Sequence, residues 1–441
     1  MKKSILAIVL VMAMLSTTGI SYASGAVDIQ TKPEIPQDSA LLAVVQENID
    51  AYKEHYILHS ITVSNKSIHQ VDNESIGVDF IVELQAELKY DSATELPHIQ
   101  GMAAQLGIDS SKLTTTEFIS NLSETNVGTS LKEIANESLS KSDSAKNSTN
   151  KPVVYNSDLV TNIAIEEIKA YVEEVESLYI GQTSPINLYF RALIDEKGLP
   201  TSVAAVAFDD STYDAQLMVP ESISTMRKNG AAQLENMVDT ALVKAQNQSE
   251  YTSQAAAAVA ATTYHRVTAR DYANAWTSNP TKGSKDTTKW RISTNPNATA
   301  PFYPANTNDC ANYVSQAIFA GGIPKTSTEV SDAYHWFASQ WGCSAAWENC
   351  THMHTFFTSN SYWTASDYAN CNAGGVIFLK DGTKSTATRY HVVMCVQNDT
   401  VTRTYSAHTS DRKAVAYTGI SSFGTDCKAL EYWVFTNSSA D

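Results

Sequence analysis

DCANYVSQAIFAGG, residues 309–322, has the pattern of a core helix with polar residues at its start. Asp309 is a favourable N-cap residue and Gly321 suits the C′ position. Between them, the apolar residues at helical spacing are Tyr313, Val314, Ala317 and Ile318. Cys310 is therefore expected in the first turn, where the helix dipole and free backbone N–H groups favour a thiolate and can bind an oxyanion. The alternative is a buried structural cysteine, so a nucleophile requires a base nearby.

A histidine on a later strand is the candidate base. Residues 390–397 alternate, with one face formed by His391, Val393 and Cys395 and the other by Val392, Met394 and Val396. A histidine at the start of an apolar strand can also be an ordinary core residue. Placed beside Cys310, however, His391 would take the thiol proton as a general base.

The hairpin after this strand indicates a third residue. A two-residue turn at Asp399 and Thr400 would put His408 opposite His391, with Ser406 diagonal to it. His408 is therefore expected to orient His391 and to complete a thiol triad with Cys310. A slip of one residue in the register would break this pairing. The residues expected to support the site and its oxyanion are Asp309, Asn312 and Ser406.

The composition separates two regions of different character. The chain has 441 residues, is 43% hydrophobic and carries a formal net charge of −16, and its length favours two or three domains. From Tyr264 onward there are 14 basic and 13 acidic residues, so the acidic excess lies earlier. Such a chain is a poor candidate for binding nucleic acid, which requires clustered Lys and Arg. The near-neutral C-terminal part contains all six cysteines: Cys310, Cys343, Cys350, Cys371, Cys395 and Cys427.

The first 23 residues have the layout of a secretory signal peptide. Lys2 and Lys3 precede an apolar run from Ile5 to Leu15, and small residues end at Ala23. This run is shorter than the roughly 18–20 residues of a spanning helix, and no later stretch is apolar enough to span a bilayer. We therefore expect cleavage after Ala23 and a secreted or cell-wall-associated protein with no membrane segment left, in a compartment that allows disulfides.

The region from residue 27 to residue 250 has the pattern of an α+β domain. The expected elements are a helix at 39–56, a half-buried strand at 76–90, a mobile loop or linker at 121–156, a helix at 159–179, a hairpin of strands 186–195 and 201–208, and a helix at 218–246. An alanine-rich linker at 251–263 then leads to the C-terminal domain, residues 264–441. The N-terminal domain has no cysteine, and its role is not evident from these patterns.

At the residues described above, the sequence resembles the amidase domain of secreted bacterial proteins. The resemblance covers about Tyr264 to Phe435, and its most specific piece is the Asp-Cys-x-Asn-[Tyr/Phe]-Val-Ser-Gln run at 309–316. Further matching pieces are Tyr264-His265-Arg266, Tyr272-Ala273, Gly321-Gly322, Trp347, Gly375-Val376-Ile377-Phe378 before His391, and Tyr405-Ser406-Ala407-His408-Thr409 with Asp411. This domain is similar to the NlpC-like and CHAP-like cysteine amidases and peptidases. The resemblance implies a papain-like α+β fold, in which a Cys opens a helix packed on an antiparallel sheet that carries the His and a polar third residue.

The same resemblance implies hydrolysis of an amide bond, with peptidoglycan stem peptides as the natural substrate class. One position departs from the family pattern. The relatives usually have Gly-Asp ahead of the Val-Ile-Phe strand, whereas this chain has Gly374-Gly375. The change removes a carboxylate near the expected site.

Two other interpretations of the C-terminal residues were weighed. The group Cys343, Cys350, His352 and His354 matches no common zinc spacing, and its two histidines would not share a helix face. The plainer alternative is a disulfide, for which Cys343 and Cys350 are the nearest pair in sequence. Aromatic residues that could line a glycan or peptide groove, but are more often core, are Tyr334, Trp336, Phe337, Trp341, Phe356, Phe357 and Trp363.

The sequence therefore predicts a secreted, thiol-dependent amidase or peptidase with Cys310 as nucleophile and His391 as base. Peptidoglycan or another peptide is the expected substrate, no cofactor or metal is expected, and a monomer is expected. The alternative is a non-catalytic wall-associated binding or structural protein with a degenerate papain-like domain. Fold alone does not separate the two, because function depends on the site.

Overall fold

The computed structural model describes residues 34–71, 75–145, 156–250, 262–280, 309–326, 335–339 and 342–440. Residues 35–441 form one compact unit. Helices account for 43% and strands for 27%, which confirms the α+β fold class. The predicted signal peptide and nearly all of the alanine-rich linker lie outside the described residues. None of the described helices has the length and apolar character needed to cross a membrane.

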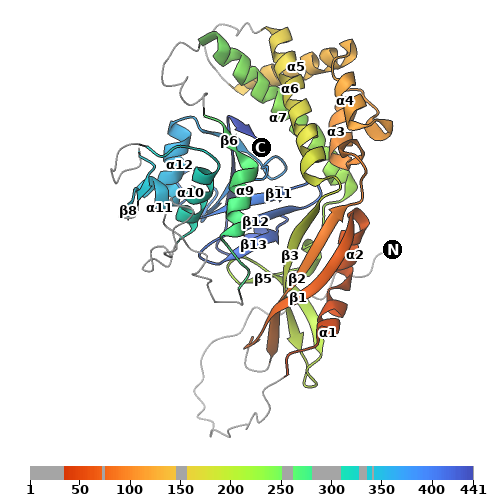
Figure 1. The fold of residues 1–441 in the computed structure, drawn as a ribbon, viewed down its shortest axis with the longest axis vertical. Helices are drawn as coiled ribbons and strands as arrows, with labels where there is room; N and C mark the ends of the chain where they lie inside the picture. The colour runs from red at the N-terminus through yellow and green to blue at the C-terminus, as the bar shows by residue number, and fades with distance from the viewer. Residues whose placement is uncertain are drawn as a thin grey trace. The chain divides into compact units, whose positions relative to one another are not determined.

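A single large sheet joins the N-terminal and C-terminal regions (Figure 1). In spatial order its strands are β1 (Tyr56–Gln70), β2 (Ile76–Leu88), β3 (Thr183–Ile194), β13 (Arg412–Ala416), β12 (Arg403–Ala407), β11 (Arg389–Asn398), β10 (Val376–Lys380), β14 (Ala429–Phe435) and β9 (Trp363–Ser366). Next to β3 lies β4 (Pro200–Val206), which pairs with β5 (Thr212–Tyr213). Neighbours are antiparallel except β3 and β13, which are parallel and pair at Asn187 and Val415.

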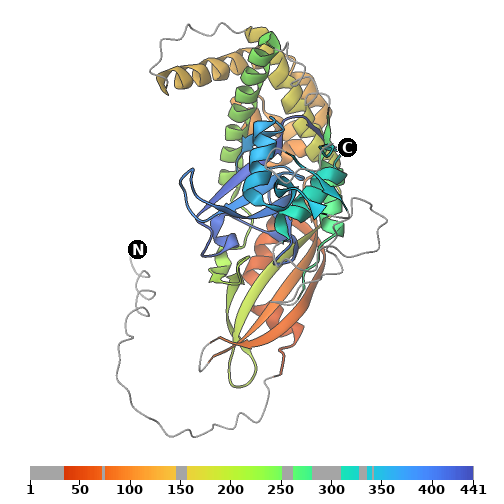
Figure 2. The same ribbon diagram turned by 90° about the vertical axis from the view of Figure 1, so that its left-hand side faces the viewer.

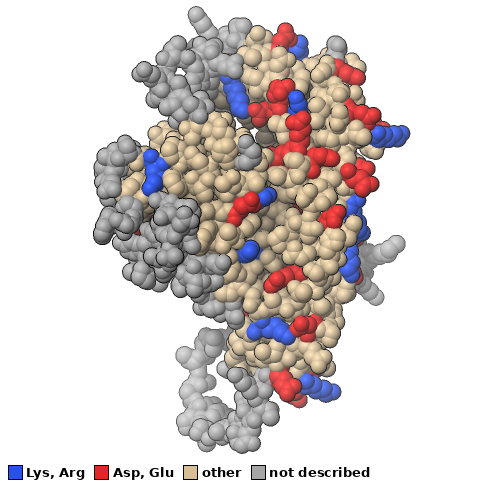
Figure 3. Space-filling view, viewed as in Figure 1, with Lys and Arg blue, Asp and Glu red and all other residues tan. Residues whose placement is uncertain are grey.

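The helices lie in an N-terminal and a C-terminal group (Figures 1 and 2). The N-terminal group consists of α1 (Asp38–Val44), α2 (Gln46–His55), α3 (Pro97–Gln105), α4 (Thr115–Asn121), α5 (Thr125–Ala145), α6 (Ser157–Tyr179) and α7 (Ile223–Glu250). The C-terminal group consists of α9 (Arg266–Ala275), α10 (Cys310–Ala320), α11 (Ala345–Glu348) and α12 (Cys350–Ser359). Smaller pairs are β6 (Tyr264–His265) with β15 (Ser438–Ser439) and β7 (Ala338–Ser339) with β8 (Gly342–Cys343). In Figure 3, acidic side chains gather over the N-terminal helices, whereas few charges lie around α10 and α12.

Most N-terminal elements lie where the sequence pattern predicts them, with two differences. The strand β2, the helices α6 and α7 and the hairpin of β3 and β4 confirm the expectation. The predicted helix at 39–56 is divided at Val45, and Tyr56 begins β1, a strand that the pattern did not indicate. The prediction of a loop is wrong for residues 125–145, which form α5. Val127, Leu131 and Ala135 are buried and recur at helical spacing, so α5 packs into the N-terminal core.

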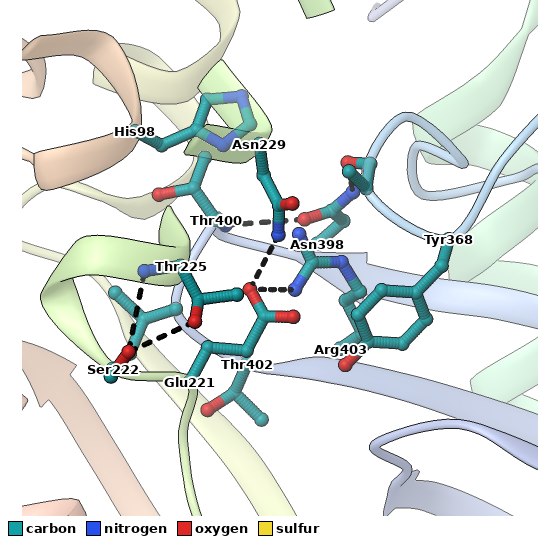
Figure 4. A network of polar contacts seen from close by, with 12 residues as sticks. His98, Glu221, Ser222, Thr225, Asn229, Tyr368, Asn398, Thr400, Thr402 and Arg403 are labelled. Atoms are coloured by element: carbon teal, nitrogen blue, oxygen red, sulfur yellow. Dashed lines mark hydrogen bonds and ion pairs between the residues drawn. The ribbon is translucent and has the colours of Figure 1, made fainter. Parts of the chain in front are cut away.

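The tip of the β11–β12 hairpin lies in a polar socket built by the N-terminal region (Figure 4). Arg403 is completely buried, forms an ion pair with Glu221 at 3.5 Å and lies over the ring of Tyr368 at 4.3 Å. Its guanidinium nitrogens have no hydrogen-bond partner among the described residues. Nearby, Tyr56 Oη donates to Asp399 Oδ2 at 2.8 Å. Side chains of the N-terminal region therefore hold the hairpin whose first strand carries His391.

Candidate active site

Cys310 is the first residue of α10, as the sequence predicts, and only 6% of its surface is exposed. Asp309 occupies the N-cap position, but its side chain does not cap the helix. Its carboxylate instead accepts a hydrogen bond from Asn312 Nδ2 at 2.7 Å and faces His408 Nδ1 at 2.7 Å. The C-cap residue is Gly321, so the left-handed residue that follows is Gly322, with φ of 95°.

Three donors converge on the sulfur of Cys310. Cys350 Sγ lies 3.7 Å from Cys310 Sγ, and the His391 side chain and the Val392 backbone N–H also donate to it. The contact from Cys350, followed by the charge and hydrogen bond of His391, holds the pKa of Cys310 well below that of an ordinary thiol despite burial. The same contact and burial raise the pKa of Cys350, which therefore remains the protonated partner.

His391 lies near the start of β11, opposite Leu379 of β10, and 4% of its surface is exposed. The Phe208 ring, from the segment after β4, lies 4.5 Å from the His391 ring between centroids. His391 Nε2 is buried and has no hydrogen-bond partner among the described residues. The structure thus places the predicted base beside the predicted nucleophile, and packing by Phe208 restricts the ring.

The predicted register of the β11–β12 hairpin is wrong. Met394 lies opposite Ser406, one position from the expected pairing, and Asn398 lies opposite Arg403. The turn has four residues because the carboxylate of Asp399 accepts hydrogen bonds from the backbone N–H groups of residues 401 and 402, at 3.0 and 2.7 Å. A further irregularity lies between residues 395 and 397. Since a slip of one residue reverses the faces, His408 does not lie opposite His391.

His408 contacts the start of α10 instead of the base. Its Nδ1 lies 2.7 Å from Asp309 Oδ2, and its Nε2 lies 2.5 Å from the carbonyl oxygen of Trp276. The Tyr313 ring stacks on His408 at 4.1 Å. His408 therefore positions Asp309, the residue before the nucleophile.

The two remaining predicted site residues lie in different surroundings. Asn312 Oδ1 accepts from Trp347 Nε1 at 2.7 Å and from Gln316 Nε2 at 3.1 Å, so this amide fixes the first turn of α10 against α11. Ser406 Oγ donates to Asn274 Oδ1 at 2.8 Å and accepts from the N–H of residue 414 at 3.0 Å. Ser406 thus joins β12 to α9 and β13. It faces Met394, three residues along β11 from His391.

Gly374 and Gly375, the departure from the family pattern, are required by packing. A Cβ at Gly375 would lie 2.7 Å from Cys371 Sγ, and one at Gly374 would lie 2.8 Å from the carbonyl oxygen of Arg266. Gly375 precedes the pair of Val376 with Met394, whereas Leu379 pairs with His391. At about 3.3 Å per residue, position 375 is about 13 Å along the strands from the base. A carboxylate there would not be adjacent to His391.

Cys343 and Cys350, which the zinc and disulfide interpretations place together, have different partners in the structure. Among the described residues, no group of three or more His, Cys, Asp or Glu side chains could hold a metal ion. The disulfide between Cys343 and Cys350 is not formed, and all six cysteines are free. Cys343 Sγ donates to Glu348 Oε2 at 3.1 Å, while Cys350 faces Cys310. Four of the aromatic residues are buried core: Trp336, Phe356, Phe357 and Trp363. Phe337 is half-buried, and Tyr334 and Trp341 lie outside the described residues.

Two residues of the site were missed by the sequence analysis. Cys350 repeats the pattern of residues 309 and 310, because Asn349 caps α12 by accepting from the N–H groups of residues 351 and 352. A polar N-cap followed by Cys was therefore a pattern that could have indicated it. No local pattern indicates Phe208, which reaches His391 only through tertiary packing.

One comparison with known proteins bears on this geometry. A family model described as "Putative amidase domain" matches residues 263–430. That range contains α9 to α12 and strands β9 to β13, and with them Cys310, Cys350, His391 and His408. Residues 263–430 are therefore an amidase-like domain, which indicates a hydrolase that acts on amide bonds. No curated protein and no solved structure matches the chain.

Proposed function

We propose that the chain is a thiol amidase or peptidase with Cys310 as nucleophile and His391 as general acid and base. The observation that carries this proposal is the convergence of Cys350, His391 and the N–H of Val392 on the Cys310 sulfur at the start of α10. These donors favour a thiolate, so the nucleophile would remain charged at a pH below the ordinary pKa of a thiol. The papain-like arrangement of a helix-opening Cys and a strand-borne His is part of the proposal.

The chain's own residues suffice for a two-step hydrolysis. The Cys310 sulfur attacks the carbonyl carbon of the substrate, and backbone N–H groups in the first turn of α10 stabilise the oxyanion. His391 gives a proton to the leaving amine and then takes one from the water that cleaves the thioester. Peptidoglycan stem peptides are the proposed substrate class, and secretion to the cell surface is the proposed location. The match to an amidase domain supports the reaction class.

A second candidate is a non-catalytic wall-associated scaffold. It is favoured by the burial of the reactive groups, since Cys310 and His391 are 6% and 4% exposed. In addition, Nε2 of His391 has no hydrogen-bond partner among the described residues, so no third residue is seen to fix the ring.

Digestion of purified cell wall separates the two candidates. Wild type should release new amino groups, whereas Cys310→Ala and His391→Ala should release them only at the background rate, because each lacks one of the two reacting groups. Cys343→Ala is a matched control, since Cys343 contacts Glu348 rather than the site, and it should retain wild-type activity. Equal background release by wild type and Cys310→Ala would support the scaffold.

A further inference from the structure

Two thiols, each at the start of a helix, face each other in the site. Cys310 opens α10 and Cys350 opens α12, and their sulfur atoms are 3.7 Å apart although the residues are 40 positions apart in the chain. Each residue is 6% exposed. Both backbones are fixed, Cys350 by the Asn349 cap and Cys310 by the contacts of Asp309. The approach of the two sulfur atoms is therefore built into the packing of α10 against α12.

Two of the remaining cysteines contact groups other than a thiol. Cys343 donates to Glu348 and Cys427 to the carbonyl oxygen of residue 429. Cys395 and Cys371 form a second, completely buried pair, in which Cys395 donates to the carbonyl oxygen of Cys371 at 3.2 Å and the contact of its thiol raises the pKa of Cys371. Burial raises the pKa of Cys343 and of Cys427, whereas the pKa of Cys310 is lowered. Because the thiolate is the reactive form, an oxidant would react first at Cys310.

We propose that Cys310 and Cys350 form a modification site, in which Cys350 captures the oxidised nucleophile as a reversible intramolecular disulfide. The oxidant class is a hydroperoxide. The Cys310 thiolate attacks the terminal oxygen of the hydroperoxide, so that an S–O bond forms, the O–O bond breaks and hydroxide leaves from hydrogen peroxide, or alkoxide from an organic hydroperoxide, which yields a sulfenic acid. The Cys350 sulfur then attacks the sulfenic sulfur while its proton goes to the leaving hydroxide. An S–S bond forms, the S–O bond breaks and water leaves.

The geometry permits this second step with a small movement. A disulfide requires the sulfur atoms to approach to about 2.05 Å, so the 3.7 Å contact must close by less than 2 Å. Reduction by a dithiol returns two electrons and restores the facing thiols. The disulfide would protect the nucleophile from further oxidation to sulfinic acid, which is not reversed by thiols. The expectation that oxidation stops hydrolysis rests on the proposed function. The expectation that the disulfide forms does not rest on it.

The test is peptide mapping of the whole protein after exposure to hydrogen peroxide. The expected result is a crosslink between the peptides that contain Cys310 and Cys350, which dithiothreitol removes. Cys350→Ser should give no crosslink, and its Cys310 should accumulate as sulfinic acid. Cys343→Ser is the matched control and should behave as wild type. Circular dichroism shows whether Cys350→Ser is folded. If it is not folded, Cys350→Ala is used in its place.

Wall-digesting activity provides a separate measurement. Peroxide should lower wild-type activity by about tenfold or more, and dithiothreitol should restore it. Each variant is compared with its own activity before peroxide, and dithiothreitol should not restore the activity that the Cys350 variant loses. An active protein that forms no crosslink between Cys310 and Cys350, or that crosslinks Cys371 to Cys395 instead, overturns the inference. An inactive protein that still forms the crosslink overturns the proposed function and leaves the inference standing.

Discussion

At the scale of single residues, the partner of His408 distinguishes the observed site from the predicted triad. His408 and Asp309 form a buried pair, with side chains 2% and 9% exposed. His391, in contrast, contacts Cys310 and Phe208. His408 therefore acts on Cys310 through the start of α10. Removal of either member takes one buried hydrogen bond from the other, which typically destabilises a protein by about 1–3 kcal/mol.

We predict that His408→Ala is coupled to Asp309→Ala and not to His391→Ala. In urea unfolding, the double variant of positions 309 and 408 should be more stable than the sum of the single changes by about 1–3 kcal/mol, because residues in contact share the lost interaction. The cycle with His391→Ala should be additive within about 0.5 kcal/mol. If His408→Ala is coupled to His391→Ala alone, the sequence-based prediction that His408 orients His391 is supported instead.

At the scale of elements, the tip of the β11–β12 hairpin depends on the ion pair between Arg403 and Glu221. Arg403 is completely buried, and the adjacent rings and carboxylate keep its pKa high, so it stays charged whether or not Glu221 is present. Glu221→Gln should therefore lower the free energy of unfolding by about 3–5 kcal/mol, because it leaves a buried cation without a counter-charge.

The same chemical change at an exposed pair provides the control. Asp50 and Lys53 form an ion pair whose side chains are 57% and 46% exposed. Asp50→Asn should change the free energy of unfolding by no more than about 1 kcal/mol. Equal effects of Glu221→Gln and Asp50→Asn, measured by urea denaturation, would show that the socket does not depend on this charge pair.

Local patterns predicted the elements of the site better than the contacts between them. The helix at Cys310 and the strand at His391 were predictable, because capping residues and apolar periodicity act within one segment. The register of His408 was not, because the side chain of Asp399 selects a longer turn than the pairing rule assumed. The N-cap pattern at Asn349 could have indicated Cys350 but not its contact with Cys310, and no local pattern indicates the contact of Phe208 with His391.

At the scale of the whole molecule, one sheet contains strands from both sides of the division predicted at residues 251–263. The sheet passes from β3 to β13 through the pair of Asn187 and Val415. Arg266, at the start of α9, is buried and forms an ion pair with Glu174 of α6, with Nη1 2.6 Å from Oε1. Phe208 lies against His391. The N-terminal region thus contacts the amidase-like domain in the core, at the sheet and at His391, and the separate N-terminal domain stays a prediction.

These contacts predict that cutting the chain between the two regions does not separate them. Limited proteolysis within 246–261 should give two fragments on a denaturing gel that elute together from a sizing column, because the shared sheet and the Arg266–Glu174 pair do not need the covalent bridge. In urea, the nicked protein should lose far-UV and near-UV circular dichroism in one transition. Glu174→Gln should lower the urea concentration at which the fragments part, since it leaves Arg266 buried and unpaired. Two fragments that elute separately and unfold at different midpoints would show instead that the N-terminal region is an independent domain, as its composition first indicated.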